Sequence, residues 1–202
     1  MIKRILILFA IAQLSMMGYS QTPKWAEKAK KAVFSVVTYD ANDKILNTGN
    51  GFFISEKGVA ISDYALFKNA QRAVIITSEG EKMPVKAILG ANDMYDVVKF
   101  SVDITSKKVA NLTLSETPMT EGTKLWLLPY STQKVRSLTS GNVNSVDKIS
   151  DYAYYTINLP LKEKMVSCPL MNDEGLVVAL AQKASGQDTA TICYGVDARF
   201  AN

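Results

Sequence analysis

Histidine is absent from all 202 residues of this chain. Because imidazole is the usual general base near neutral pH, its absence excludes Ser-His-Asp and Cys-His nucleophilic sites. Cysteine is scarce as well, and Cys168 and Cys193 are the only two. The common zinc sites built from cysteine and histidine therefore lack their ligands, and we expect neither a metal site nor a cofactor.

The two cysteines permit one disulfide, between Cys168 and Cys193, if the chain is secreted. Both lie in apolar stretches of the sequence, which fits two buried thiols equally well. The sequence leaves the disulfide and the free thiols open as alternatives.

A strong excess of charge of either sign is also lacking. The formal net charge is +4, and it falls to +2 (4 − 2) when Lys3 and Arg4 are removed with a leader peptide. The lysines are dispersed along the chain, so we expect no nucleic-acid-binding surface.

Residues 1–20 have the pattern of a signal peptide. Two basic residues precede an apolar run at 5–14, and the small residues Gly18 and Ser20 come just before Gln21. The apolar run is short for a bilayer span. We therefore expect cleavage before Gln21, no membrane span in the mature chain, and a secreted or periplasmic location.

Short runs of β-branched and aromatic residues fill most of the mature chain after a short helical stretch at 25–31. Turn signals rich in Gly, Asn and Asp separate these runs, and a less apolar connection at 103–122 divides them into two sets of about six. An all-β chain has to close or cover its sheet edges, so the pattern predicts paired barrels or a sandwich. The expected strands are 33–39, 51–55, 59–62, 73–77, 83–91, 97–101, 124–129, 135–146, 152–159, 168–171, 176–182 and 189–196.

Residues 49–62 resemble a segment of trypsin-like serine proteases of the Deg/HtrA type. In that family a Gly-x-Gly-Phe strand turns at a polar glycine corner and runs into Leu-Thr-Asn-x-His, which carries the catalytic histidine. The continuation here is Ile61-Ser62-Asp63-Tyr64-Ala65. The resemblance places the histidine position on Ala65, or on Tyr64 if the alignment shifts by one residue. Residues 90–100 are similar to the family's segment with the triad aspartate, which falls on Asp96.

The family's nucleophile motif is Gly-Asn-Ser-Gly-Gly-Pro-Leu, and the matching run is Lys164-Met165-Val166-Ser167-Cys168-Pro169-Leu170. The Pro-Leu pair aligns, so the nucleophile position falls on Val166. The glycines that shape the oxyanion loop are replaced by Lys164, Ser167 and Cys168. Residues 137–143 look like the Thr-Val-Thr-x-Gly strand of the family's second barrel.

The resemblance covers roughly residues 25–200 and implies an all-β chymotrypsin-like fold with two six-stranded antiparallel β-barrels. The expected domain is 21–202, with barrel one at about 32–102, a linker at about 103–122 and barrel two at about 123–202.

The degenerate triad predicts a pseudoprotease that binds a peptide or protein partner without cleaving it. Strands and clefts of protease folds pair with extended peptides without using the triad. Two alternatives stay open: an active peptidase with Cys168 or Ser167 as an atypical nucleophile, and a purely structural domain of a larger assembly. The candidate binding cleft is lined by Tyr64, Lys164, Met165, Ser167 and Cys168.

Overall fold

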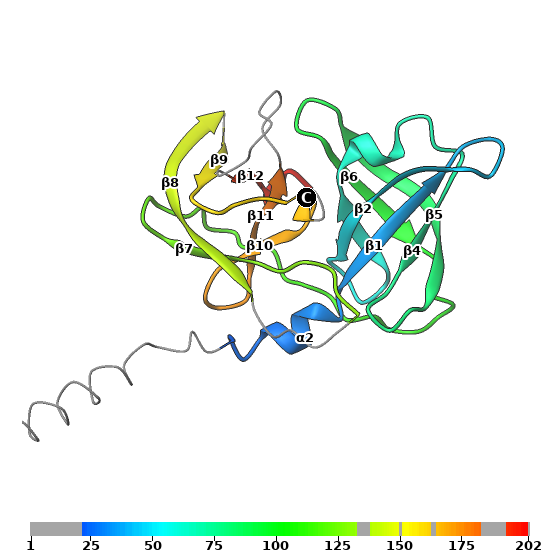
Figure 1. Cartoon of the computed structure of the whole chain (residues 1–202), viewed down its shortest axis with the longest axis horizontal. Helices are drawn as coiled ribbons and strands as arrows, with labels where there is room; N and C mark the ends of the chain where they lie inside the picture. Colours follow the sequence, from blue (N-terminus) through cyan, green and yellow to red (C-terminus); the bar gives the residue numbers. More distant parts are fainter. Residues whose placement is uncertain (1–21, 133–137, 150, 163–164, 183–192, 202) are drawn as a thin grey trace, which may run out of the picture.

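The computed structural model describes residues 22–132, 138–149, 151–162, 165–182 and 193–201. Two closed antiparallel β-barrels stand side by side, with the short helix α2 (Ala26–Lys30) beneath them (Figure 1). This confirms the fold class expected from the sequence. The expected signal peptide at 1–20 lies outside the described residues. Within the described part of the chain, no helix is long and apolar enough to cross a membrane.

The first barrel has the strand order β1-β2-β3-β6-β5-β4. Neighbouring strands in sequence form hairpins, and β1 closes the barrel by pairing with β4. Irregular register in the β5–β6 pair lets the long β5 bend, as closure of a small barrel requires. The strands are β1 (Val33–Tyr39), β2 (Ile45–Phe53), β3 (Val59–Ser62), β4 (Arg72–Ile76), β5 (Lys82–Asn92) and β6 (Val97–Val102).

The second barrel repeats this arrangement with the order β10-β11-β12-β9-β8-β7. Its strands are β7 (Lys124–Leu127), β8 (Thr139–Ile149), β9 (Tyr152–Ile157), β10 (Pro169–Met171), β11 (Val177–Gln182) and β12 (Cys193–Asp197). The predicted strands at 135–146 and 189–196 begin earlier than β8 and β12, and parts of both lie outside the described residues.

Each barrel has its own apolar interior, and a third cluster joins the two. In this joint cluster Phe52 and Ile61 of the first barrel pack with Trp126 and Leu180 of the second, and all four side chains are buried. Helix α2 adds Ala29 to the same cluster. The barrels therefore share a dry interface whose packing fixes their relative position.

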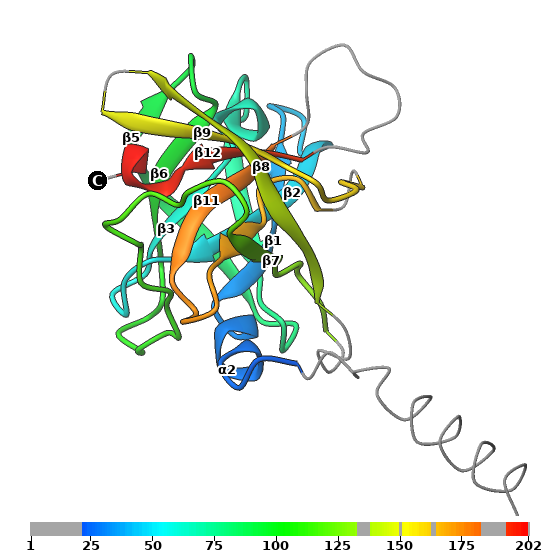
Figure 2. The ribbon, with the colours of Figure 1, turned by 90° about the vertical axis from the view of Figure 1, so that its left-hand side faces the viewer.

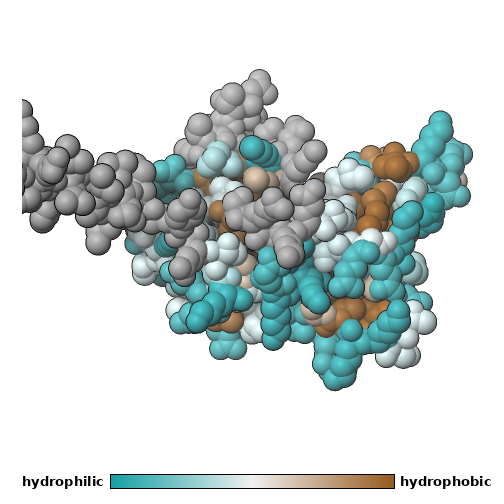
Figure 3. All heavy atoms as spheres, turned by 60° about the horizontal axis from the view of Figure 1, so that its bottom comes forward, coloured by the Kyte–Doolittle hydropathy of each residue, from teal (hydrophilic) through white to brown (hydrophobic). Residues whose placement is uncertain are grey.

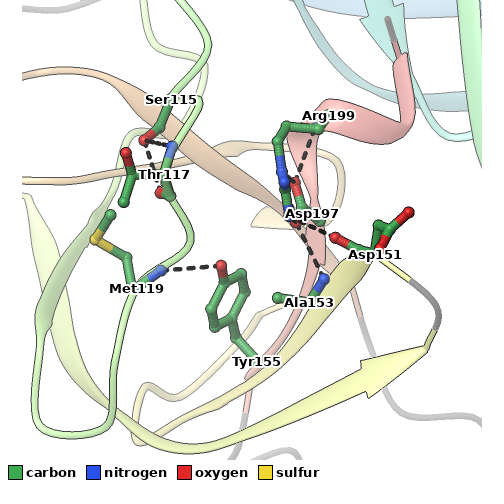
Figure 4. A network of polar contacts seen from close by, with 8 residues as sticks. All are labelled: Ser115, Thr117, Met119, Asp151, Ala153, Tyr155, Asp197 and Arg199. Atoms are coloured by element: carbon green, nitrogen blue, oxygen red, sulfur yellow. Dashed lines mark hydrogen bonds and ion pairs between the residues drawn. The ribbon is translucent and has the colours of Figure 1, made fainter.

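The connection after β6 crosses from one barrel to the other and is bonded to both. The Leu112 N–H donates to Phe53 O at 2.8 Å, and the Ser115 N–H donates to Val177 O at 2.7 Å. Further along, the Met119 N–H donates to the Tyr155 hydroxyl at 3.1 Å (Figure 4).

The C-terminal 3-10 helix η3 (Ala198–Ala201) is held by an ion pair between the partly exposed Arg199 and the buried Asp197. Arg199 Nη2 lies 2.6 Å from Asp197 Oδ2, and the Ala153 N–H donates to the same carboxylate (Figure 4). Arg199 also donates to Asp151 O at 2.9 Å, which ties η3 to the tip of the β8–β9 hairpin (Figure 2). Helix η3 contacts both β11 and β6, so it lies at the junction of the barrels.

Candidate functional site

The expected histidine position, Ala65, lies on the 3-10 helix η1 (Tyr64–Phe67), which follows β3 directly. Ala65 is exposed, and its backbone N–H donates to Asp96 Oδ1 at 2.6 Å. The Tyr64 N–H donates to the backbone oxygen of Asp96 at 3.3 Å. Asp96 therefore satisfies the free N–H groups at the start of η1, where it acts as a cap.

The expected nucleophile position, Val166, lies in the turn before β10. Its side chain is half-buried, and its backbone oxygen accepts a 2.7 Å hydrogen bond from Asn50 Nδ2 of β2. Asn50 is in turn held by Ser62, whose hydroxyl donates to Asn50 O at 2.6 Å. A hydrogen bond thus joins the turn before β10, in the second barrel, to β2 of the first barrel. This contact lies next to Ser62, the last residue of β3 before η1.

A second polar link joins the barrels at Asp96. The Gln182 side-chain amide, at the end of β11, donates to Tyr95 O at 3.0 Å and to Asp96 O at 3.3 Å. The Tyr95 and Tyr154 rings pack nearby with centroids 5.7 Å apart. The three positions expected for a triad therefore lie on segments that meet at the junction of the barrels, and the side chains of Ala65 and Val166 carry no polar functional group.

Ser167 occupies a backbone conformation that favours glycine, with φ +64°. Its N–H donates to Ala181 O at 2.9 Å, and its side chain is only 1% exposed. Within the described part of the chain, the Ser167 hydroxyl has no hydrogen-bond partner. Ser167 therefore stands in a turn conformation that a glycine would adopt at less cost.

Asp63, which precedes η1, is the buried acid of this region. It is 4% exposed, and within the described residues its Oδ1 atom has no hydrogen-bond partner. Burial raises the pKa of Asp63 to about 7, and the negative charge of Asp96 adds to the rise. The nearby Ser167 hydroxyl and Gln182 amide lower this pKa in part, although the hydroxyl does not reach bonding geometry.

Both cysteines are free buried thiols in the structure. Cys168 and Cys193 are each 0% exposed and belong to the interior of the second barrel. Burial raises the pKa of each thiol to about 12. A thiol with this pKa and no solvent contact is a poor nucleophile and a poor metal ligand.

The five residues expected to line a binding cleft differ in their placement. Tyr64 and Met165 are half-buried, so each presents part of its surface to solvent. Ser167 and Cys168 are buried and line no solvent-facing surface in this structure. Lys164 lies outside the described residues.

The sequence reasoning missed Asp63, Asn50 and Gln182, which make or border the contacts between the barrels. An acid directly after the apolar strand β3 is the one signal that could have drawn attention to Asp63. Across the described ranges, no group of three or more His, Cys, Asp or Glu side chains could hold a metal ion.

The sequence profile of the trypsin-like peptidase domain matches residues 49–180, which is more than half of the chain. The matched segment includes Ala65, Asp96 and Val166, and it spans both barrels. Comparison with curated proteins gives no match. The family match and the two six-stranded barrels agree, and the chain belongs to the trypsin-like peptidase domain family.

Proposed function

We propose that this protein is an exported trypsin-like peptidase homologue that has lost catalysis and binds a peptide or protein partner. The observation that carries the proposal is the pair Ala65 and Val166, which stand at the histidine and serine positions. In a triad enzyme the serine oxygen attacks the carbonyl and the histidine accepts its proton. A methyl group and an isopropyl group can perform neither step, and such losses cost roughly four decades or more in rate.

The third triad position supports the same conclusion. Asp96 has no imidazole to orient, and its carboxylate accepts the Ala65 N–H instead. That bond stabilises η1 and needs no catalytic histidine. The retained aspartate is therefore explained by the fold alone.

An atypical nucleophile is the alternative, and one contact favours it: the Ser167 hydroxyl lies beside a carboxyl group whose pKa is about 7. A carboxylate with this pKa could accept a proton near neutral pH. However, Ser167 and Asp63 are 1% and 4% exposed, so a substrate carbonyl cannot approach the hydroxyl in this conformation. Cys168 is still less suited, because burial holds its thiol in the protonated form.

Two surfaces could serve a partner. The first consists of the partly exposed side chains of Tyr64 and Met165, which directly precede the expected triad positions Ala65 and Val166. The second is the outside of the first barrel, where hydrophobic patches interrupt the polar surface (Figure 3). Exposed apolar patches often mark protein-binding sites. The exposed large hydrophobic residues are Ile45, Leu46, Ile88, Leu89 and Met94.

Export is proposed on the signal-like pattern of residues 1–20, and the test is the N-terminal sequence of the secreted or periplasmic protein. A chain that begins at Gln21 is expected. An intact leader on the protein from that compartment would contradict this part of the proposal.

Selection of displayed peptides on the mature chain, followed by titration of the enriched class, tests the binding function. We expect saturable binding that Tyr64→Ala weakens at least about tenfold, because an aromatic contact is lost. The matched control is Leu89→Ser, which removes an apolar side chain that is 52% exposed on β5 of the first barrel. Circular dichroism establishes that both variants are folded.

The pattern of losses separates the hypotheses. If Leu89→Ser weakens peptide binding and Tyr64→Ala does not, the partner binds to the outer surface of the first barrel. The absence of any binder, together with self-association in light scattering, would favour the purely structural alternative.

A further inference from the structure

A carboxyl group and a hydroxyl group lie beside each other across the junction of the barrels, each with an unsatisfied atom. Asp63 comes from the first barrel and Ser167 from the second. Within the described residues, Asp63 Oδ1 and Ser167 Oγ are both buried and both without a hydrogen-bond partner. Buried polar atoms are rarely left in this state, so such a pair calls for a physical explanation.

The surroundings of Asp63 favour its protonated form. Burial favours this form most, and the negative charge of Asp96 in the first barrel acts in the same direction, whereas the Gln182 amide and the Ser167 hydroxyl of the second barrel oppose it in part. The Cys168 thiol, also in the second barrel, is close enough to be affected by the charge of Asp63. A protonated carboxyl carries no charge and can share a hydrogen bond with the Ser167 hydroxyl, whereas an ionised carboxylate at this buried position carries a charge that the Ser167 hydroxyl and the Gln182 amide offset only in part.

The loop that faces Asp63 is strained, although several hydrogen bonds hold it. Asn50 holds Val166 O, and Ser167 donates to Ala181 O. Ser167 also adopts a φ of +64°, which costs a residue with a side chain more than it costs glycine. Movement of this loop would relieve strain and admit water to the junction, and it would uncover Cys168, which packs at the edge of the loop in the interior of the second barrel.

We propose that Asp63 is a proton-controlled latch between the barrels. While the Asp63 carboxyl is protonated, residues 165–168 stay packed against the first barrel. With the carboxyl ionised, these residues move away and solvent enters the junction. The inference goes beyond the proposed binding function and does not depend on it, because it concerns the junction whether or not a partner binds there.

The buried thiol of Cys168 is a built-in reporter of this opening, and Cys193 is its internal control. Both thiols are 0% exposed, but Cys168 belongs to the loop and Cys193 to β12. The experiment labels the folded chain with a maleimide from about pH 6 to about pH 8.5 and reads each thiol by peptide mass spectrometry. The wild type is compared with Asp63→Asn at each pH, which cancels the intrinsic pH dependence of thiol reactivity.

We expect the ratio of Cys168 labelling rates, wild type over Asp63→Asn, to rise about tenfold across this range and to level off above neutral pH. Cys168 should also react faster than Cys193 at the alkaline end, because the loop opens without unfolding of the barrel. Asp93→Asn serves as a control, since Asp93 is an exposed acid of the first barrel, in the β5–β6 turn that also carries Asp96. Its labelling should follow that of the wild type.

Two results would overturn the latch: a ratio that does not change with pH, or equal labelling of the two thiols at every pH. If Asp63→Asn does not fold, an NMR titration of the Asp63 carboxyl carbon in the wild type replaces it. A midpoint near that of a free aspartate would then refute the proposal, and a midpoint near neutrality with shifts at residues 165–168 would support it.

Discussion

The Asp96 carboxylate accepts a 2.6 Å hydrogen bond from the backbone N–H of Ala65, the residue at the position where a histidine was expected. Asp96 itself has a φ of +51°, a conformation that aspartate and asparagine adopt more readily than most residues. The backbone of Asp96 thus shapes the end of the β5–β6 turn, and its side chain caps the first turn of η1. Its retention in a chain without histidine has a structural cause.

Substitutions of Asp96 should therefore reduce stability in a definite order. Asp96→Asn keeps an acceptor oxygen and the tolerated φ, so its effect should be small. Asp96→Gly loses the cap but accepts the φ, and Asp96→Ala loses both, at a cost of about 2 kcal/mol. Urea unfolding measures the free energies, and an alanine variant as stable as the wild type would contradict the capping role.

Ser167→Gly should stabilise the protein by about 1–2 kcal/mol. Glycine removes the cost of a positive φ and also removes a buried hydroxyl with no partner. Ser167→Ala is the control, because it removes the hydroxyl and keeps the backbone strain. We expect the glycine variant to be the more stable of the two in thermal or urea unfolding, and the reverse order would refute the strain argument.

Asp63→Asn should change how stability depends on pH. The pKa of Asp63 is about 7 in the folded protein against a reference of 3.8, so between these values the folded state holds a proton that the unfolded state has lost. The contribution of this group to stability therefore falls as pH rises from about 4 to about 7 and is constant above, by at most about 4 kcal/mol in total.

The measurement is the difference in unfolding free energy between wild type and Asp63→Asn across this range. The difference should move in favour of the asparagine variant as pH rises. A difference independent of pH would show that Asp63 titrates normally in the folded chain.

Asp173 should contribute more to stability than its neighbour Glu174. Its carboxylate accepts a 2.6 Å hydrogen bond from the Trp126 indole, and its backbone oxygen accepts one of 3.0 Å from Trp25. Asp173→Ala should cost about 1–2 kcal/mol, because a partly buried indole N–H loses its partner. Glu174→Ala, at an exposed position, should cost less than about 0.5 kcal/mol, and equal losses in urea unfolding would contradict the assignment.

The bounds of a strand could be predicted from the sequence where most of its residues are apolar. Strands β1 and β3 coincide with the expected ranges, because β-branched and aromatic residues dominate both. The first half of β2 was missed, since Ile45–Gly49 is largely exposed and contains Asn and Gly. These residues are strand because they pair with β1, which is a tertiary cause that no local pattern records.

The motif spacing predicts where the site lies, and that assignment stays a prediction, whereas the contacts around it could not be predicted. Motif spacing located Ala65, Asp96 and Val166, all within the family match. The approach of Asp63 to Ser167 and the Asn50–Val166 bond join residues more than a hundred positions apart, and only the closed barrels bring them together. The burial of Ser167 likewise follows from barrel packing, because no local pattern marks this serine as buried, whereas the apolar stretch around Cys168 already left a buried thiol as one alternative.

The central claim is that this trypsin-like fold no longer cleaves peptides. Incubation of the mature chain with a complex peptide mixture, with products read by mass spectrometry, tests it most directly. The account predicts no new termini above those produced by the double variant Ser167→Ala/Cys168→Ala, because neither buried side chain can act as a nucleophile. Reproducible cleavage by the wild type that either substitution abolishes would contradict it.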